Sequence, residues 1–173
     1  GRLLASAGMK EADLKLVNMT FRDIIAALGT GKAEIGVVAE PLVTQAVEKN
    51  IAVIWKRADE VYPNQQYGAL MYGPGLINKP DLARKFMVAY LKGVRFYNDA
   101  LKGKASKDEL AQILIKHTSV KDPEVYKKMA YPGLHPDGTL NAAGMDYDVK
   151  WWAANGRMKE AIDPTRLIDM SYA

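Results

Sequence analysis

The stretch EIGVVAEPLVTQA, residues 34–46, decides the predicted fold because a strand ends in it and a helix begins. Its small and apolar residues 36–39 are followed at once by Glu40 and Pro41. Proline suits the first position of a helix, where its missing N–H has no helical partner in any case. We therefore predict a strand over residues 33–38 and a helix from Pro41 onward, with Glu40 at the junction.

The segments around this junction continue the alternation. LKLVN (residues 14–18) and IAVIWK (residues 51–56) have the apolar content of short strands. FRDIIAALG (residues 21–29) and LVTQAVEKN (residues 42–50) are expected to form helices, the first by its apolar spacing of three and four. Strands that alternate with helices across short turns are typical of a parallel sheet, so residues 1–58 predict an α/β fold.

The pattern changes after this α/β portion. Residues 59–75 contain a Pro-Asn turn and an extended stretch, which predicts a crossing segment, and residues 76–173 are mostly helical in pattern. A long helix is expected to open at Pro80, and Ser106 is a good cap for the next one. The predicted sheet looks incomplete, because three strands and two helices cannot bury both faces of a parallel sheet.

Composition excludes several classes of protein. The chain has 173 residues, of which 49% are hydrophobic and 25% charged, the balance of an ordinary globular protein. It contains no cysteine, which excludes disulfides, thiol catalysis and cysteine-ligated metal sites within it. The net charge of +4 comes from interspersed charges and not from one basic cluster, so nucleic-acid binding is not expected. No apolar run approaches the length of a membrane span.

Glu40 is the first candidate site residue and has two interpretations. In a parallel sheet, ligands bind outside the carboxyl ends of the strands, which would make Glu40 one wall of a pocket. A carboxylate at a helix N-terminus can equally serve as a local cap that accepts backbone N–H groups. If Glu40 faces the ligand, the ligand is expected to carry an amine or a protonatable ring nitrogen, because the carboxylate would repel an anion.

Five further polar residues are candidates for ligand binding. Asn18 and Thr20 follow the first predicted strand, where they could orient a ligand or could simply cap the next helix. Gln65, Gln66 and Tyr67 lie on the predicted crossing segment. One of these three is expected to face a cleft, although glutamines on a crossing strand can also satisfy only backbone groups.

The sequence pattern predicts no catalytic site. His117 and His135 are far apart in sequence and have no cysteine partners, so neither a metal cluster nor a triad is predicted. GTGK (residues 29–32) lacks the upstream glycine and the following Ser or Thr of a phosphate loop. We expect Trp152 to pack in the core and Trp151 to be free for stacking or an interface. No cofactor and no metal are expected.

Several motifs, taken together, carry a family resemblance. The chain resembles periplasmic substrate-binding proteins of the nitrate/sulfonate/taurine type, including the NMT1/THI5-like group. The resemblance rests on DLKLVNMTFRDIIAALGTGKAEIGVVAEPLVTQAVEKN (13–50), YPNQQYGALMYG (62–73), LARKFMVAYLKGVRFYNDAL (82–101), KHTSVKDPEVYKKM (116–129), YPGLHPDG (131–138) and LIDMSY (167–172).

The resemblance implies a bilobal fold and a transport function. It implies a periplasmic binding protein of type II, with residues 1–58 in the second lobe, 59–75 as hinge and 76–173 returning to a first lobe expected upstream of Gly1. It also implies a non-catalytic, periplasmic or extracytoplasmic component of an ABC importer that delivers taurine, a sulfonate, nitrate or a pyrimidine precursor of thiamine to permease subunits. A signal peptide is expected upstream. The alternatives are a pyrimidine-precursor synthase, against which the absence of cysteine argues, and a ligand-sensing domain on the same fold.

Overall fold

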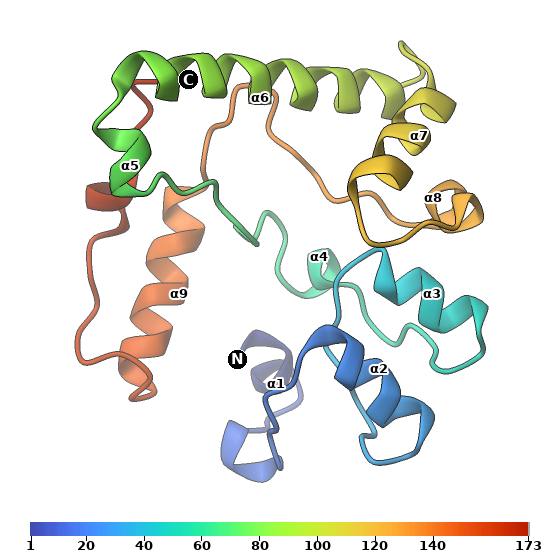
Figure 1. Cartoon of the computed structure of the whole chain (residues 1–173). Coiled ribbons are helices and arrows are strands. Elements are labelled where there is room, and N and C mark those ends of the chain that lie inside the picture. The colour runs from blue at the N-terminus through green and yellow to red at the C-terminus, as the bar shows by residue number, and fades with distance from the viewer. Residues whose placement is uncertain (173) are drawn as a thin grey trace.

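All regular secondary structure in the described part of the chain is helical. The computed structural model describes residues 1–172, and Figure 1 shows its helices arranged around a central course of irregular chain. In chain order the elements are α1 (Arg2–Ser6), the 3₁₀-helix η1 (Glu11–Asp13), α2 (Phe21–Gly29), α3 (Leu42–Glu48), α4 (Ala58–Val61), α5 (Pro74–Ile77), α6 (Pro80–Leu101), α7 (Lys107–His117), α8 (Pro123–Lys128), α9 (Ala142–Ala154) and the 3₁₀-helix η2 (Pro164–Leu167).

The predicted α/β fold with a parallel sheet is wrong for residues 1–172. Residues 14–18, 33–38 and 51–56 contain no strand, and no backbone hydrogen bond joins one of these segments to another. Their apolar side chains stay in solvent, with Val37 82% and Val53 88% exposed. A strand is stable only when a neighbouring strand pairs with its backbone groups, and that pairing is not specified by local pattern. The periplasmic-binding-protein type II architecture that depended on this sheet is therefore absent from the described chain.

The predicted helices are confirmed, and their ends follow from local chemistry. The Thr20 side chain accepts a hydrogen bond from the Asp23 backbone N–H at 3.3 Å at the start of α2. The Ser106 side chain accepts one from Glu109 N–H at 3.1 Å at the start of α7. Pro80 begins the 22-residue helix α6, as its missing N–H favours. Pro41 lies one position earlier than predicted, as the N-cap of α3.

The two buried clusters of the core lie on α6, α7, α8 and the turn between α7 and α8. One cluster contains Tyr97, Ala100 and Leu110, and a second contains Val120, Val125 and Tyr126. Both form where the helices that follow one another along the chain fold back and pack together (Figure 1). Because helices satisfy their own backbone, burying one apolar face is enough to stabilise this part of the chain.

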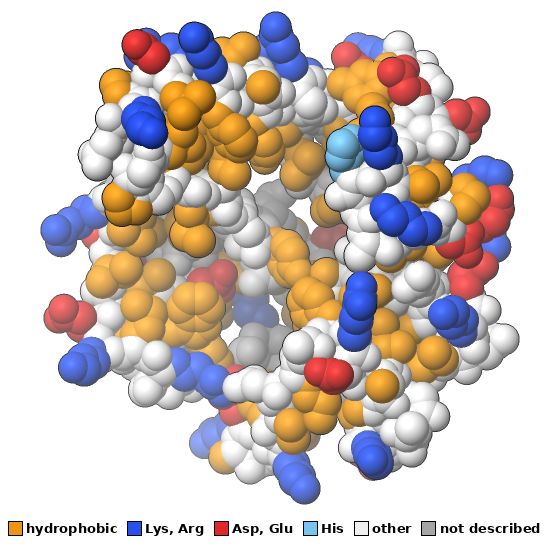
Figure 2. Space-filling model, in the orientation of Figure 1, with side chains coloured by type: hydrophobic (Ala, Val, Ile, Leu, Met, Phe, Trp, Pro, Cys, Tyr) orange, Lys and Arg blue, Asp and Glu red, His pale blue; other side chains and the backbone are white. Residues whose placement is uncertain are grey.

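The loop between α8 and α9 is fixed against α6. The Tyr97 hydroxyl donates to the Pro132 carbonyl at 2.6 Å, and the Asn98 side-chain amide donates to the Leu134 carbonyl at 3.0 Å. Figure 1 shows this loop running from α8 to α6 and then down to α9. On the face seen in Figure 2, hydrophobic side chains border a hollow at the centre of the molecule. Among the described residues, no helix is both long and apolar enough to cross a membrane.

Candidate functional site

Both carboxylate oxygens of Glu40 accept hydrogen bonds from the protein itself. Its Oε2 accepts the Thr44 backbone N–H and its Oε1 accepts the Thr44 hydroxyl, both at 3.0 Å. Oε1 also lies 3.3 Å from the Ala130 backbone N–H in the chain after α8. Glu40 therefore caps α3 and ties it to α8, which agrees with the local-cap interpretation of this residue.

The other sequence-predicted candidates are spread over the chain. Thr20 caps α2, and Asn18 is exposed two residues before it. The Gln66 side chain accepts the Asn141 backbone N–H at 2.8 Å, which satisfies a backbone group at the start of α9. Gln65 is exposed, and Tyr67 is 72% exposed.

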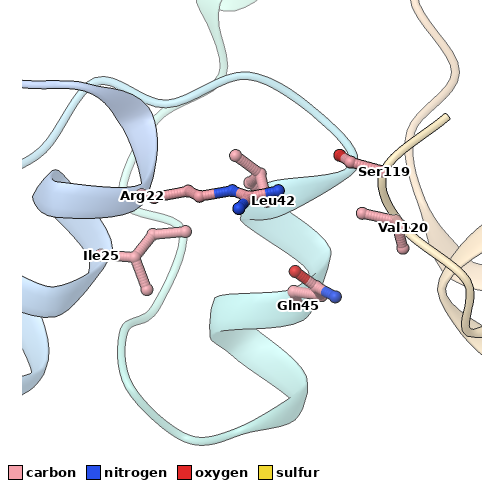
Figure 3. A pocket seen from close by; sticks show the side chains of 6 residues that line it. All are labelled: Arg22, Ile25, Leu42, Gln45, Ser119 and Val120. Atoms are coloured by element: carbon pink, nitrogen blue, oxygen red, sulfur yellow. The ribbon is translucent and has the colours of Figure 1, made fainter.

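A small cavity that is open to solvent lies instead between α2, α3 and the turn that joins α7 to α8. Its volume is about 220 Å³. Each of the three elements contributes two side chains, as Figure 3 shows. The lining residues are Arg22 and Ile25 of α2, Leu42 and Gln45 of α3, and Ser119 and Val120 of the turn. None of the six sequence-predicted candidates is among them.

Helical spacing and local contacts explain this arrangement. Arg22 and Ile25 are three residues apart on α2, so their side chains share one face of that helix. Leu42 and Gln45 are related in the same way on α3. The turn is held in place because the Val120 carbonyl accepts the Tyr126 hydroxyl at 2.9 Å. The wall formed by the turn is therefore fixed by a contact outside the cavity.

Arg22 is the only charged residue that lines this cavity. In residues 1–172, no carboxylate forms a salt bridge with its guanidinium group. Gln45 and Ser119 add an amide and a hydroxyl, and the other three lining side chains are aliphatic. A guanidinium beside neutral donors and an aliphatic wall can hold a small anion with an apolar part.

The described residues offer no metal centre. No group of three or more His, Asp or Glu side chains in residues 1–172 is arranged to hold a metal ion. His117 lies in the last turn of α7, and the Nδ1 atom of His135 accepts the Asp137 backbone N–H at 3.3 Å. Each histidine is therefore placed by its own segment, His117 by helix α7 and His135 by its loop.

Comparison with known proteins identifies the family. The sequence profile described as "NMT1/THI5 like" matches residues 1–100, which is more than half of the chain. The chain therefore belongs to the NMT1/THI5-like family, a group of solute-binding and related proteins that are typically extracytoplasmic. No curated protein and no solved structure matches the chain.

None of the residues that line the cavity was predicted from the sequence as a site residue. The spacing of Arg22 and Ile25 is visible in the sequence, and it would have shown a charge beside the apolar face of a helix. Ser119 and Val120 come from a turn about 75 positions further along the chain than Leu42 and Gln45, and no local signal indicates that they meet.

Proposed function

We propose that this chain is part of the solute-binding component of an ABC importer and that the cavity beside Arg22 receives a small anionic solute. Membership of the NMT1/THI5-like family supports a small-molecule ligand. The observation that carries the proposal is the position of Arg22, a cation without an ion-pair partner in residues 1–172, among neutral donors and aliphatic side chains. The protein acts as a carrier and not as a catalyst.

The chemistry of the cavity favours a sulfonate among the solutes that the resemblance implies. A guanidinium group donates two parallel hydrogen bonds to an oxyanion, and Gln45 and Ser119 can donate to its remaining oxygens. Ile25, Leu42 and Val120 suit a short alkyl chain. A cavity of about 220 Å³ is smaller than the ~300 Å³ at which drug-sized pockets begin, which suits a solute of few atoms.

Glu40 does not line the cavity beside Arg22, so its carboxylate gives no reason to expect an amine on a solute bound there. The expectation of an amine required a carboxylate facing the solute, but both oxygens of Glu40 already accept hydrogen bonds from Thr44 and Ala130. A nitrogen-bearing group is therefore not needed for recognition by this cavity.

The proposed transport role implies membrane partners and a location for the protein. We propose that the loaded protein delivers its solute to membrane permease subunits from the periplasmic or extracytoplasmic side. The crossing segment, residues 59–75, would be the hinge about which the protein closes on the solute. Closure is favoured only by contacts that the solute makes in the closed state, so release to the permease follows when these contacts are lost.

Isothermal titration calorimetry with ethanesulfonate tests the solute-binding proposal. Wild-type protein should bind it saturably, and Arg22→Gln should lose most of this binding, because the neutral amide cannot replace the charge-assisted hydrogen bonds. Arg166→Gln, which changes an exposed arginine on η2, is the matched control and should bind as wild type does. Diethyl sulfone, an uncharged sulfone, should not bind. Equal binding of ethanesulfonate by Arg22→Gln and wild type would refute the proposed site.

A further inference from the structure

A second site is suggested by the way the chain holds Arg2. The guanidinium carbon of Arg2 lies 3.7 Å from the centre of the Tyr62 ring and 4.0 Å from the centre of the Tyr147 ring. Both distances are well inside the ~6 Å over which a cation is attracted to an aromatic face. The two tyrosines are 85 positions apart in the sequence, so the chain brings them together around one cation.

The two rings also contact each other, and Tyr62 is hydrogen-bonded to α9. Their centroids are 5.6 Å apart and their planes meet at 73°, which is the favourable edge-to-face arrangement. The Tyr62 hydroxyl donates to the Gly144 carbonyl in the first turn of α9 at 3.1 Å. Tyr147 lies on the same helix. The cation therefore lies against two rings that also contact each other.

Trp151 extends this aromatic surface. It lies four residues after Tyr147 on α9, which places the two side chains on one face of the helix. Its indole ring packs so closely on Gly1 that a Cβ atom there would lie 2.6 Å from the ring. The residue next to Arg2 thus contacts a third aromatic side chain, and we call Tyr62, Tyr147 and Trp151 the aromatic site.

Charge at the aromatic site suits an organic cation. Arg2 forms no salt bridge with a carboxylate among the described residues, so the rings are its main partners. Burial is the main cause that raises the pKa of the Tyr62 phenol, and the negative charge of Asp148 contributes in the same direction. Asp148 is therefore near enough to add a negative potential that favours a cation beside the rings.

We propose that the aromatic site binds small guanidinium compounds and that Arg2 is its internal occupant. The evidence is the contact of one guanidinium group with two tyrosine rings, in the absence of a salt bridge. Arg2 is exposed and lies at the start of the five-residue helix α1, so few contacts hold it against a competing ligand. Guanidinium groups stack on aromatic faces through both charge and planarity, which distinguishes them from ammonium groups. The site shares no residue with the cavity beside Arg22.

Titration of the Arg2→Ala variant with methylguanidinium, followed by intrinsic fluorescence, tests this inference. Removing the internal occupant should give saturable binding at least threefold tighter than in wild type, because the ligand no longer competes with Arg2. The double variant Arg2→Ala/Tyr147→Leu should bind roughly three- to tenfold more weakly than Arg2→Ala, because one ring face is lost. Methylurea, an uncharged molecule of similar shape, should not bind to any variant.

Two results would overturn the inference. One is the absence of saturable methylguanidinium binding by an Arg2→Ala variant whose circular dichroism spectrum matches that of wild type. The other is equal affinity of Arg2→Ala and Arg2→Ala/Tyr147→Leu. Neither result bears on ethanesulfonate binding beside Arg22, so failure at one site is distinguishable from failure at the other.

Discussion

Apolar side chains are buried very differently in two parts of the molecule. One is the helical region, residues 80–128, and the other is the extended region, by which we mean the irregular segments 14–18, 33–38 and 51–56. Every buried residue of the two core clusters lies in the helical region. In the extended region, Val37, Val53 and Trp55 are 82%, 88% and 64% exposed. Helices complete their hydrogen bonds locally, whereas strands require partners that are distant in sequence. The comparison shows that apolar content alone does not lead to burial.

The largest effect is expected in the core of the helical region. Leu110 is 4% exposed and packs with Tyr97 and Ala100, so Leu110→Ala leaves a cavity. We expect a loss of about 3 kcal/mol in the free energy of unfolding, measured by urea denaturation. A loss below about 1 kcal/mol would mean that this cluster is as loosely packed as the extended region.

Alkaline pH should weaken the same core. Burial, and to a lesser degree the neighbouring Tyr131, raises the pKa of Tyr97 from 10.0 to about 12. The unfolded chain therefore ionises at lower pH than the folded protein, so the stabilisation is complete below pH 10 and is lost as the pH rises to about 12. A rise of this size corresponds to at most about 2.7 kcal/mol.

Tyr97→Phe isolates this contribution from that of other groups. The variant should lose about 1 kcal/mol at neutral pH, because its hydroxyl no longer donates to Pro132. Its further loss between pH 10 and pH 12 should be smaller than that of wild type by the Tyr97 contribution. Parallel pH profiles of unfolding free energy for the two proteins would contradict the assignment.

The contact between α3 and the chain after α8 should have an intermediate effect. Glu40 joins α3 to the chain after α8 through the Thr44 and Ala130 groups. Glu40→Ala should lower the free energy of unfolding by about 1–2 kcal/mol, because a cap and its hydrogen bonds are lost. Glu40→Gln keeps one acceptor oxygen and should lose less. Thermal unfolding that is unchanged in Glu40→Ala would show that the contact contributes nothing to stability.

The smallest effect is expected for Val37→Thr, which we compare with the matched substitution Val125→Thr. Val37→Thr in the extended region should change the free energy of unfolding by less than about 0.5 kcal/mol, because the side chain is already in solvent. Val125→Thr in the helical region places a hydroxyl at a position that is 2% exposed and should cost about 1–3 kcal/mol. Equal losses in urea denaturation would contradict the difference between the two regions.

The sequence predicted local features well and distant contacts poorly. The caps at Thr20 and Ser106 and the start at Pro80 are encoded by a few adjacent residues, and all three are confirmed. The sheet was predicted from segments that are individually suited to strands, but pairing depends on distant neighbours and did not form in residues 1–172. The sequence therefore predicts features that depend on neighbouring residues, but not the pairing of segments that are distant along the chain.

The candidate site shows the same difference between local features and distant contacts. Asn18, Thr20 and Glu40 were selected because the predicted sheet placed its strand ends together, and without the sheet they have no common edge. The cavity lies instead between α2, α3 and the turn that joins α7 to α8, with Arg22 on one side and Ser119 on the other. Of the functional features, only the family could be predicted from the sequence, because the order and spacing of its motifs can be recognised without tertiary structure.

The most direct test of solute binding is an NMR titration of the ¹⁵N-labelled protein with ethanesulfonate. We predict saturable shifts of the Gln45 side-chain amide and of the Ser119 and Val120 backbone N–H groups, which are lost in Arg22→Gln. Shifts that persist unchanged in Arg22→Gln, or that occur only at residues away from α2, α3 and this turn, would contradict the proposed site.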